Sequence, residues 1–401
     1  MTDHRGADTD CGAGEDVAGP AKSVGRTRDR SGTRGKAHWR LGAAAAAVVA
    51  FASGGAWAQD SAAASATSAA DLGGMDQLIA AAKEEGELNV IALPPDWANY
   101  GTMIETFAEK YGIEVNSAQP DASSQDEINA ANQLRGQDRA PDVFDLGANV
   151  ALRNTDLFAP YKVATWDDIP DALKDPDGLW VSDYGGYMSI GYDADAVPPV
   201  TSVADLLKPE YRGRVALNGN PTQAAAGFNG VMMVALANGG SADDIAPGVE
   251  FFRQLKEAGN FLPVDPTPAT IASGQTPVVI DWEYLNVGQG ATLEGQRDWQ
   301  TVVPDNAIVG AFYVQSINKD APHPAAARLW QEFLYSDEGQ NIWLHGFARP
   351  VRLEAMIEAG TADEEAVANL PAPKGTPVFL TQEQIEQQQQ YLLEHWEQAV
   401  E

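Results

Sequence analysis

The chain has 401 residues, of which 57 are acidic and 26 are basic, so its formal net charge is −31. Nucleic acids and anionic membrane surfaces repel such a protein, and the composition therefore argues against both as partners. The length exceeds that of one ordinary hydrophobic core and predicts two domains.

Residues 1–58 have the composition of a secretory signal peptide. An Arg-rich run precedes the apolar segment Leu41–Phe51, and Ala56-Trp57-Ala58 fits the small-residue cleavage pattern. The apolar segment is shorter than the ~20 residues that span a bilayer. We therefore expect export across the inner membrane to the periplasm or the exterior. The Ala/Ser-rich residues 59–71 then form a flexible N-terminus.

The first strand of the exported chain leads into an aromatic loop. Leu88–Leu93 reads as a strand that two prolines end, and Asp96, Trp97 and Tyr100 follow in the loop before the helix Thr102–Tyr111. Ligands of open α/β sheets usually lie beyond the carboxyl ends of strands. The loop is therefore a candidate ligand wall.

Three later segments add candidates by the same reasoning. Asp145 lies near the end of the predicted strand 141–147, and the strand pattern 180–193 carries Tyr184 and Tyr187. The loop that contains Thr222 precedes an apolar helix, Ala224–Asn238. The unpaired backbone N–H groups at the start of this helix would suit an anionic group.

The stretch Thr276–Asn286 is the strongest candidate. Val278, Val279 and Ile280 predict a strand buried on both faces. If the chain stays extended, Asp281 and Glu283 share one side and Trp282 lies on the other. Charges directly after a buried strand need solvent, a partner or a ligand. We predict that this stretch lines a ligand cleft, with either its acidic or its aromatic face.

Two segments follow that stretch in the remaining chain. A strand over Ile308–Ile317 carries Tyr313 and leads back to the first domain. Thr381-Gln-Glu-Gln384 predicts a capping box for the last helix, Gln382–Glu397.

Motifs for catalysis and cofactors are missing from the sequence. No His, Cys and carboxylate grouping has metal-ligand spacing, and the G-x-S-x-G, Walker and G-x-G-x-x-G patterns are absent. Asp281 and Glu283 could serve a glycosidase as acid and base, but such enzymes hold the two groups on opposing sides of the scissile bond. We therefore expect no catalysis, no cofactor and no metal. A secreted carbohydrate-active enzyme is the less favoured alternative.

Four segments, in this order, resemble the extracellular solute-binding proteins of bacterial ABC importers, a family that includes polyamine and ferric-ion receptors. They are residues 88–115, 140–147, 206–215 and 326–340. The resemblance implies a type II periplasmic-binding-protein fold: two α/β lobes, each a mixed sheet flanked by helices, joined by hinge strands. It also implies a small-molecule ligand between the lobes and delivery to a membrane permease. We expect a monomer, with lobe 1 (plus the C-terminal helices) at 72–195 and 310–401 and lobe 2 at 196–309.

The ligand that the resemblance favours is a polyamine or another amine-bearing cation. The loop 96–100 is similar to the aromatic-acidic loop of polyamine receptors, although Asn99 stands where an acid is often found. In that loop aromatic rings pack against methylenes and carboxylates bind ammonium groups. Ferric receptors usually have an adjacent tyrosine pair, which this chain lacks, but its separated tyrosines keep iron open. A phosphonate or another oxyanion would use residues 220–222. The full set of predicted ligand-binding residues is Asp96, Trp97, Tyr100, Asp145, Tyr184, Tyr187, Thr222, Asp281, Trp282, Glu283 and Tyr313.

Overall fold

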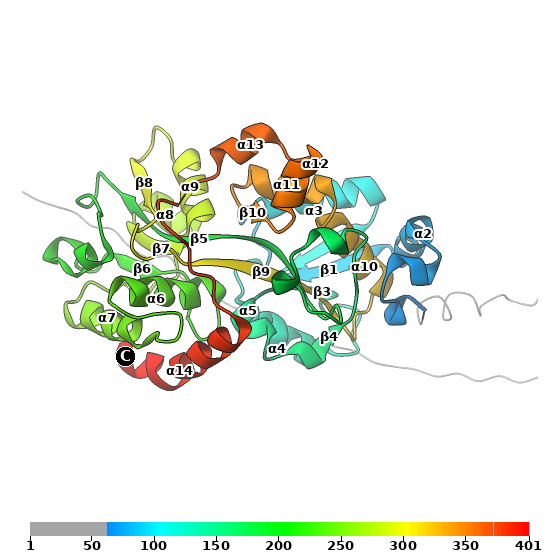
Figure 1. The fold of residues 1–401 in the computed structure, drawn as a ribbon, viewed down its shortest axis with the longest axis horizontal. Coiled ribbons are helices and arrows are strands. Elements are labelled where there is room, and N and C mark those ends of the chain that lie inside the picture. The colour runs from blue at the N-terminus through cyan, green and yellow to red at the C-terminus, as the bar shows by residue number, and fades with distance from the viewer. Residues whose placement is uncertain (1–61, 372, 401) are drawn as a thin grey trace, which may run out of the picture. The chain divides into compact units, whose positions relative to one another are not determined.

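Two sheets carry the fold of the computed structural model, which describes residues 62–371 and 373–400 (Figure 1). The predicted signal peptide lies outside these residues. β1 (Glu87–Ile91) and β2 (Glu114–Ala118) form a parallel pair. The larger sheet has eight strands, with β3, β9, β5, β7 and β6 as its main path. Its strands are β3 (Val143–Gly147), β4 (Phe158–Ala159), β5 (Val181–Asp193), β6 (Val215–Leu217), β7 (Val278–Trp282), β8 (Trp299–Val302), β9 (Gly310–Asn318) and β10 (Arg349–Pro350).

The long strand β5 joins the two parts of the larger sheet. Its first half pairs antiparallel with β9 and β10, and its second half, from Met188, pairs antiparallel with β7 and β8. β7 lies between β5 and β6 and runs parallel to β6. The sheet is therefore mixed, as the sequence predicted, and all five residues of β7 are buried.

Helices surround both sheets and agree in place with most predicted ones. The apolar helix α6 (Ala225–Ala237) is almost wholly buried, because it is hydrophobic on every side. The last helix begins with the predicted capping box, in which Thr381 and Gln384 exchange hydrogen bonds. The other α-helices are α2 (Met75–Glu85), α3 (Tyr100–Tyr111), α4 (Ser124–Leu134), α5 (Ala148–Ala151), α7 (Ala246–Glu257), α8 (Pro268–Ser273), α9 (Glu283–Thr292), α10 (Pro324–Leu334), α11 (Asp337–His345), α12 (Leu353–Ala359), α13 (Glu364–Asn369) and α14 (Gln382–Val400). Short 3-10 helices are η1 (Ala69–Leu72), η2 (Thr155–Leu157), η3 (Trp166–Asp168), η4 (Asp171–Leu173), η5 (Val203–Leu207) and η6 (Pro209–Tyr211).

The chain stops being extended at Trp282, earlier than the sequence predicted. Trp282 has strand-like angles (φ −60°, ψ 142°) and is the N-cap residue of α9, whose first residue is Glu283. An acidic side chain in the first turn is favourable because the helix dipole is positive there. Gly288 and Gly290 lie inside this helix. The predicted alternation of Asp281 and Glu283 on one face is therefore wrong.

The first described residues pack against α10. Ala63 and Ala66 are buried, and the guanidinium of Arg328 donates hydrogen bonds to the carbonyls of Ala64 and Ala66. These contacts anchor residues 62–71, which the sequence predicted as a flexible N-terminus.

The C-terminal helix α14 packs against α7, where Trp396 lies edge-on to Phe252 at 5.1 Å between ring centroids. It also contacts α5 (Figure 1). It thus joins elements that the sequence assigned to different lobes, and the lobe boundaries stay a prediction.

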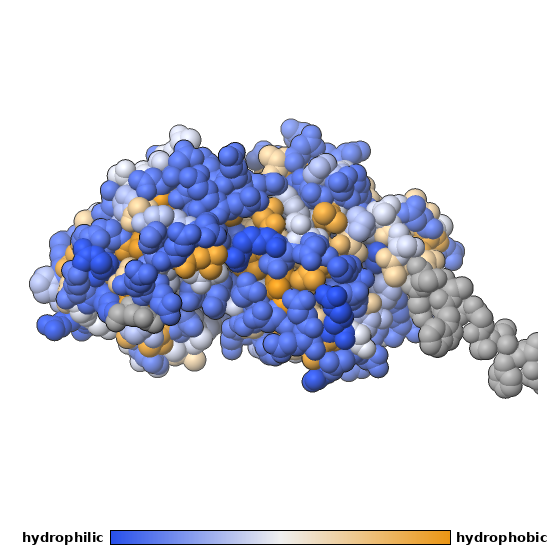
Figure 2. Space-filling model, turned by 90° about the horizontal axis from the view of Figure 1, so that it is seen from below, coloured by the Kyte–Doolittle hydropathy of each residue, from blue (hydrophilic) through white to orange (hydrophobic). Residues whose placement is uncertain are grey.

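The face in Figure 2 is mostly hydrophilic, with hydrophobic residues in small separate areas. No helix in residues 62–371 and 373–400 is long and apolar enough to cross a membrane.

Candidate functional site

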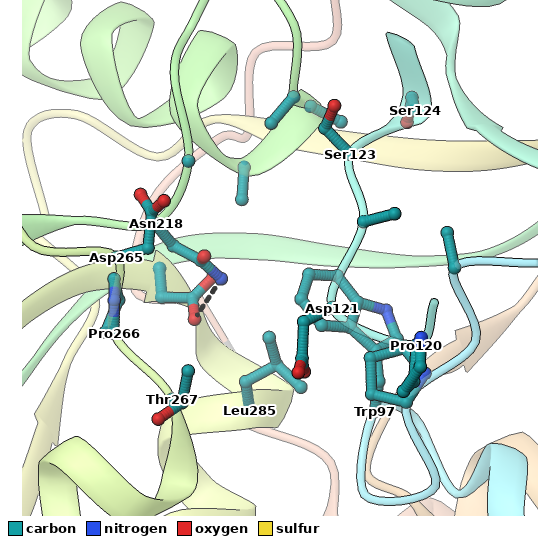
Figure 3. Close-up of a pocket in the computed structure, with 18 of the residues that line it drawn as sticks. Trp97, Pro120, Asp121, Ser123, Ser124, Asn218, Asp265, Pro266, Thr267 and Leu285 are labelled. Atoms are coloured by element: carbon teal, nitrogen blue, oxygen red, sulfur yellow. Dashed lines mark hydrogen bonds between the residues drawn. The ribbon is translucent and has the colours of Figure 1, made fainter. Parts of the chain in front are cut away.

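A cleft of about 400 Å³ opens where several strands end. Its walls come from the segments after β1 and β2, from Asp145 in β3, from the loop after β6, and from Asp281 in β7. This is the position at which open α/β sheets bind ligands. Figure 3 shows Trp97 and Asp121 on one side of the cleft and Asn218 and Asp265 on the other.

The cleft is strongly acidic. Seven of its lining residues are acids, none is basic, and none of the seven forms an ion pair with another described residue. Three of them are buried and four are exposed. The buried acids are Glu127, Asp145 and Asp281, and the exposed ones are Asp96, Asp121, Asp126 and Asp265.

Asp145 and Glu127 form a pair of neighbouring buried acids. The backbone N–H of Asp145 donates a hydrogen bond to Glu127 Oε2 at 3.1 Å, and the hydroxyl of Tyr184 donates to Asp145 Oδ2 at 3.0 Å. Burial raises the pKa of both carboxyl groups, and the charge of Asp145 raises that of Glu127 further. Two such groups favour protonation in the empty cleft and ionisation beside a bound cation.

Asp281 is the third buried acid and is 6% exposed. Its Oδ2 accepts a hydrogen bond from the amide of Asn218 at 2.8 Å (Figure 3). Its Oδ1 accepts one from the backbone N–H of Trp282 at 2.8 Å. Burial nevertheless raises the pKa of Asp281 to about 7. The carboxylate is thus fixed in orientation but lacks a positive partner.

Trp97 supplies an aromatic wall. Its indole N–H donates a hydrogen bond to the hydroxyl of Tyr184 at 2.8 Å, and its ring lies edge-on to Tyr313 at 5.8 Å between centroids. Both Trp97 and Tyr313 line the cleft. The indole is therefore held at one end, next to the acids.

The structure brings five of the predicted ligand-binding residues to the cleft, namely Asp96, Trp97, Asp145, Asp281 and Tyr313. Six others do not line it, and most of them have internal roles. Tyr100 and Tyr184 are fully buried, Trp282 stacks on Tyr284 at 6.0 Å between centroids, and the hydroxyl of Thr222 donates to the side chain of Asn220. The six are Tyr100, Tyr184, Tyr187, Thr222, Trp282 and Glu283.

Glu283 has a partner of opposite charge within the protein. Its Oε1 lies 2.6 Å from Arg349 Nη1, and its Oε2 accepts a hydrogen bond from the backbone N–H of Tyr187. Burial raises the pKa of Glu283 to about 7, and Arg349 opposes that rise. The carboxylate that the sequence paired with Asp281 is therefore part of an internal ion pair.

Sequence reasoning missed Glu127 and Asn218 as cleft residues. Glu127 lies on the buried face of α4 with Ile128 and Ala131, and this position was a readable signal. Asn218 directly follows β6, and Asp281 is the last residue but one of β7. The exposed acids Asp121, Asp126 and Asp265 carry no such signal, because acids are frequent throughout this chain.

No group of three or more His, Cys, Asp or Glu side chains in the part of the chain that the structure describes is arranged to hold a metal ion.

The chain belongs to the bacterial extracellular solute-binding proteins. The sequence model of that family matches residues 139–386, more than half of the chain. The protein is therefore an extracellular solute-binding protein, as the sequence resemblance implied.

Solved structures share the fold at low sequence identity. A periplasmic binding protein from A. tumefaciens R10 in complex with agropinic acid is 13% identical, with a TM-score of 0.62 over 79% of this chain and 98% of that one. The ferric binding protein from Campylobacter jejuni is 17% identical, with a TM-score of 0.57 over 78% and 99%. A protein from Listeria monocytogenes assigned to a spermidine/putrescine ABC transporter is 13% identical, with a TM-score of 0.59 over 78% and 98%. The predicted type II periplasmic-binding-protein fold is confirmed.

Proposed function

We propose that this protein is the extracytoplasmic receptor of an ABC importer and captures an amine-bearing cation, a polyamine above all, for delivery to a membrane permease. The observation that carries the proposal is the charge of the cleft, where seven acids meet no basic residue and no internal ion-pair partner among the described residues. Carboxylates that are taken out of water need a positive partner or a proton. A bound ammonium group would supply the first.

The arrangement of the cleft suits a cation with apolar spacers. Asp145 and Asp281 lie in different strands, β3 and β7, and Trp97 lines the same cleft. An aromatic ring can pack against methylenes while carboxylates accept hydrogen bonds from ammonium groups. The neighbour assigned to spermidine/putrescine transport has the same fold, which is compatible with this ligand class.

The same cleft disfavours the alternatives kept open by the sequence. An oxyanion at the start of α6 would lie in a cleft lined by seven carboxyl groups, with no basic residue among the described lining residues. Tyr184 and Tyr187, the separated tyrosines that kept ferric ion open, do not line the cleft. The cationic amine is therefore the single ligand class that we propose.

The remaining parts of the proposal follow from the receptor role. Residues 1–58 direct export and are removed, and the monomeric exported chain closes on its ligand by a hinge motion of lobes 72–195 with 310–401 and 196–309. β5 and β9, which pair with each other, are the proposed hinge strands. The cleft binds its ligand without catalysis.

Ligand screening of the exported protein tests the proposal. We expect putrescine or spermidine to raise the melting temperature, because a ligand that binds only the folded state stabilises it. Betaine, ferric citrate, a phosphonate and a neutral sugar serve as comparison ligands. Stabilisation by the phosphonate or by ferric citrate, with none by any amine, would contradict the proposal. Turnover of a glycan that Asp281→Asn abolishes would favour an enzyme instead.

A further inference from the structure

We propose that Tyr184, which does not line the cleft, is a positioning residue that sets the cleft's affinity for its cation by holding Trp97 and Asp145 with one hydroxyl group. This inference rests on the proposed function and adds a residue that determines affinity without touching the ligand.

The hydroxyl of Tyr184 joins two walls of the cleft. It accepts a hydrogen bond from the indole N–H of Trp97 at 2.8 Å and donates one to Asp145 Oδ2 at 3.0 Å. An indole N–H can only donate, and a tyrosine hydroxyl has one proton, so the ionised carboxylate receives that proton as a hydrogen bond. The hydroxyl oxygen of Tyr184 therefore links Trp97 to Asp145, as the acceptor for the indole and the donor to the carboxylate.

The ring of Tyr184 is fixed by its neighbours. It is fully buried, stacks on Tyr313 with centroids 5.5 Å apart and planes 6° apart, and lies against Trp343 at 5.1 Å. Close packing on both sides leaves its hydroxyl little freedom to move. A hydroxyl fixed in this way can hold its two partners in place before the ligand arrives, which lowers the entropy cost of binding.

The charges around Asp145 make this hydrogen bond important. Glu127 on α4 and Asp183 on β5 are nearby acids. The neutral side chains that interact with Asp145 or pair with it across the sheet are Tyr100, Tyr184, Tyr284, Tyr313, Tyr335 and Gln315. Burial raises the pKa of Asp145, and the hydroxyls of Tyr184 and Tyr100 oppose that rise. Without the Tyr184 hydroxyl, Asp145 would keep its proton to higher pH and bind a cation less well.

The substitution Tyr184→Phe removes the hydroxyl and keeps the ring. We expect the Kd for spermidine, measured by calorimetry on the exported protein, to rise about tenfold, as for a lost hydrogen bond to a charged group. Binding is also measured from about pH 5 to about pH 9. We expect the pH at which half of the binding is lost to be higher in Tyr184→Phe than in the wild type. The matched control is Tyr211→Phe, which removes another buried tyrosine hydroxyl, bonded to the carbonyl of Pro198, outside the cleft. It should leave both quantities unchanged.

A double-mutant cycle with Asp145→Asn separates positioning from general destabilisation. If Tyr184 acts through Asp145, adding Tyr184→Phe to Asp145→Asn should no longer shift the pH profile, and little affinity should be lost beyond the contribution of Trp97. Asp145→Asn alone removes one of the titrating acids and should make the profile shallower than that of the wild type, with Asp281 still titrating, and so tests the same link if Tyr184→Phe does not fold. A weaker Kd with an unmoved pH profile in Tyr184→Phe, or a profile in Asp145→Asn as steep as that of the wild type, would overturn the inference. Wild-type protein that binds no amine would overturn the proposed function and this inference together.

Discussion

The fully buried Glu283 forms an ion pair with Arg349, whose side chain is 16% exposed, and Oε1 of the carboxylate lies 2.6 Å from Nη1 of the guanidinium. Asp281, two residues earlier, has no ion-pair partner among the residues that the structure describes, and it lines the cleft. The helix that begins at Glu283 turns the second carboxylate away from the first. Two acids that look equivalent in the sequence therefore have different roles: one stabilises the fold and the other is available to a ligand.

Removal of the partner charge should destabilise the protein and spare its cleft. In Arg349→Met, Glu283 keeps its burial and loses its ion pair, so we expect the free energy of unfolding to fall by about 3 kcal/mol at neutral pH. The loss should shrink at lower pH, because Glu283, whose pKa burial raises to about 7, then becomes protonated. Urea unfolding at several pH values measures this effect. The double variant with Glu283→Gln should recover part of the stability, and its spermidine Kd should stay near the wild-type value. A large loss of affinity in that double variant would place Glu283 in ligand binding after all.

Replacement of Asp281, the cleft acid, should lower the affinity for the ligand without lowering the stability of the fold, which is the opposite of what we expect for Arg349→Met. Asp281→Asn removes a carboxylate whose pKa burial raises to about 7, from a usual 3.8. Because the folded protein holds this proton more tightly than the unfolded chain does, the contribution of Asp281 to stability is fully present below about pH 4 and is lost as the pH rises through about 7.

We therefore expect Asp281→Asn to raise the free energy of unfolding by about 1 kcal/mol at about pH 8, after allowing for one lost hydrogen bond, because the asparagine has a single oxygen for the two donors Trp282 N–H and Asn218 Nδ2. Its affinity for spermidine should fall about tenfold or more, because a buried charged contact is removed. Denaturation and calorimetry on the same samples measure the two effects. Lower stability at pH 8 together with unchanged affinity would show that Asp281 only supports the fold. Asp305→Asn, an exposed substitution outside the cleft, is the control.

Cation binding to the wild-type protein should strengthen as the pH rises. Burial raises the pKa of Asp281 to about 7 and also raises that of Asp145, so both acids carry protons in part near neutral pH. A bound ammonium group favours their ionised forms, and binding must then release protons. Calorimetry at about pH 6 in two buffers of different ionisation enthalpy measures the number released. Uptake of protons on binding would contradict the acidic subsite, and so would an affinity that does not rise with pH.

The order of elements could be predicted from the sequence because local patterns determine it. The β-branched run 278–280, the apolar helix α6 and the capping box at Thr381 each depend on neighbours in the chain. Five of the eleven predicted ligand residues also reach the cleft, since residues at strand ends converge there. Whether those residues contact a ligand stays a prediction.

The rest of the site depends on contacts that no local pattern contains. The hydrogen bond from Trp97 to Tyr184 joins residues 87 positions apart, and the ion pair of Glu283 needs Arg349, 66 positions later. Because α9 begins at Glu283, strand alternation does not place the Glu283 carboxylate on the same face as Asp281. Alternation along a strand predicts the facing of side chains only as far as the strand continues.

The C-terminal helix α14 ties the two predicted lobes together through Gln389. Its Oε1 accepts a hydrogen bond from the side chain of Asn149 at 3.0 Å, and its Nε2 donates one to the carbonyl of Thr222 at 2.9 Å. Gln389 is fully buried, so removal of its amide leaves both partners without their hydrogen bonds.

We expect Gln389→Leu to lower the free energy of unfolding by about 2 kcal/mol, since one buried and one part-buried polar group lose their partners. Gln390→Leu is the matched control, because the neighbouring Gln390 is exposed and bonds only Glu394 within α14. Urea unfolding measures both variants, and equal stabilities would contradict the tie. If the tie also restrains the hinge, Gln389→Leu should change the difference in radius of gyration between empty and spermidine-bound protein in solution scattering. An unchanged difference with reduced stability would limit the role of Gln389 to holding α14 in place.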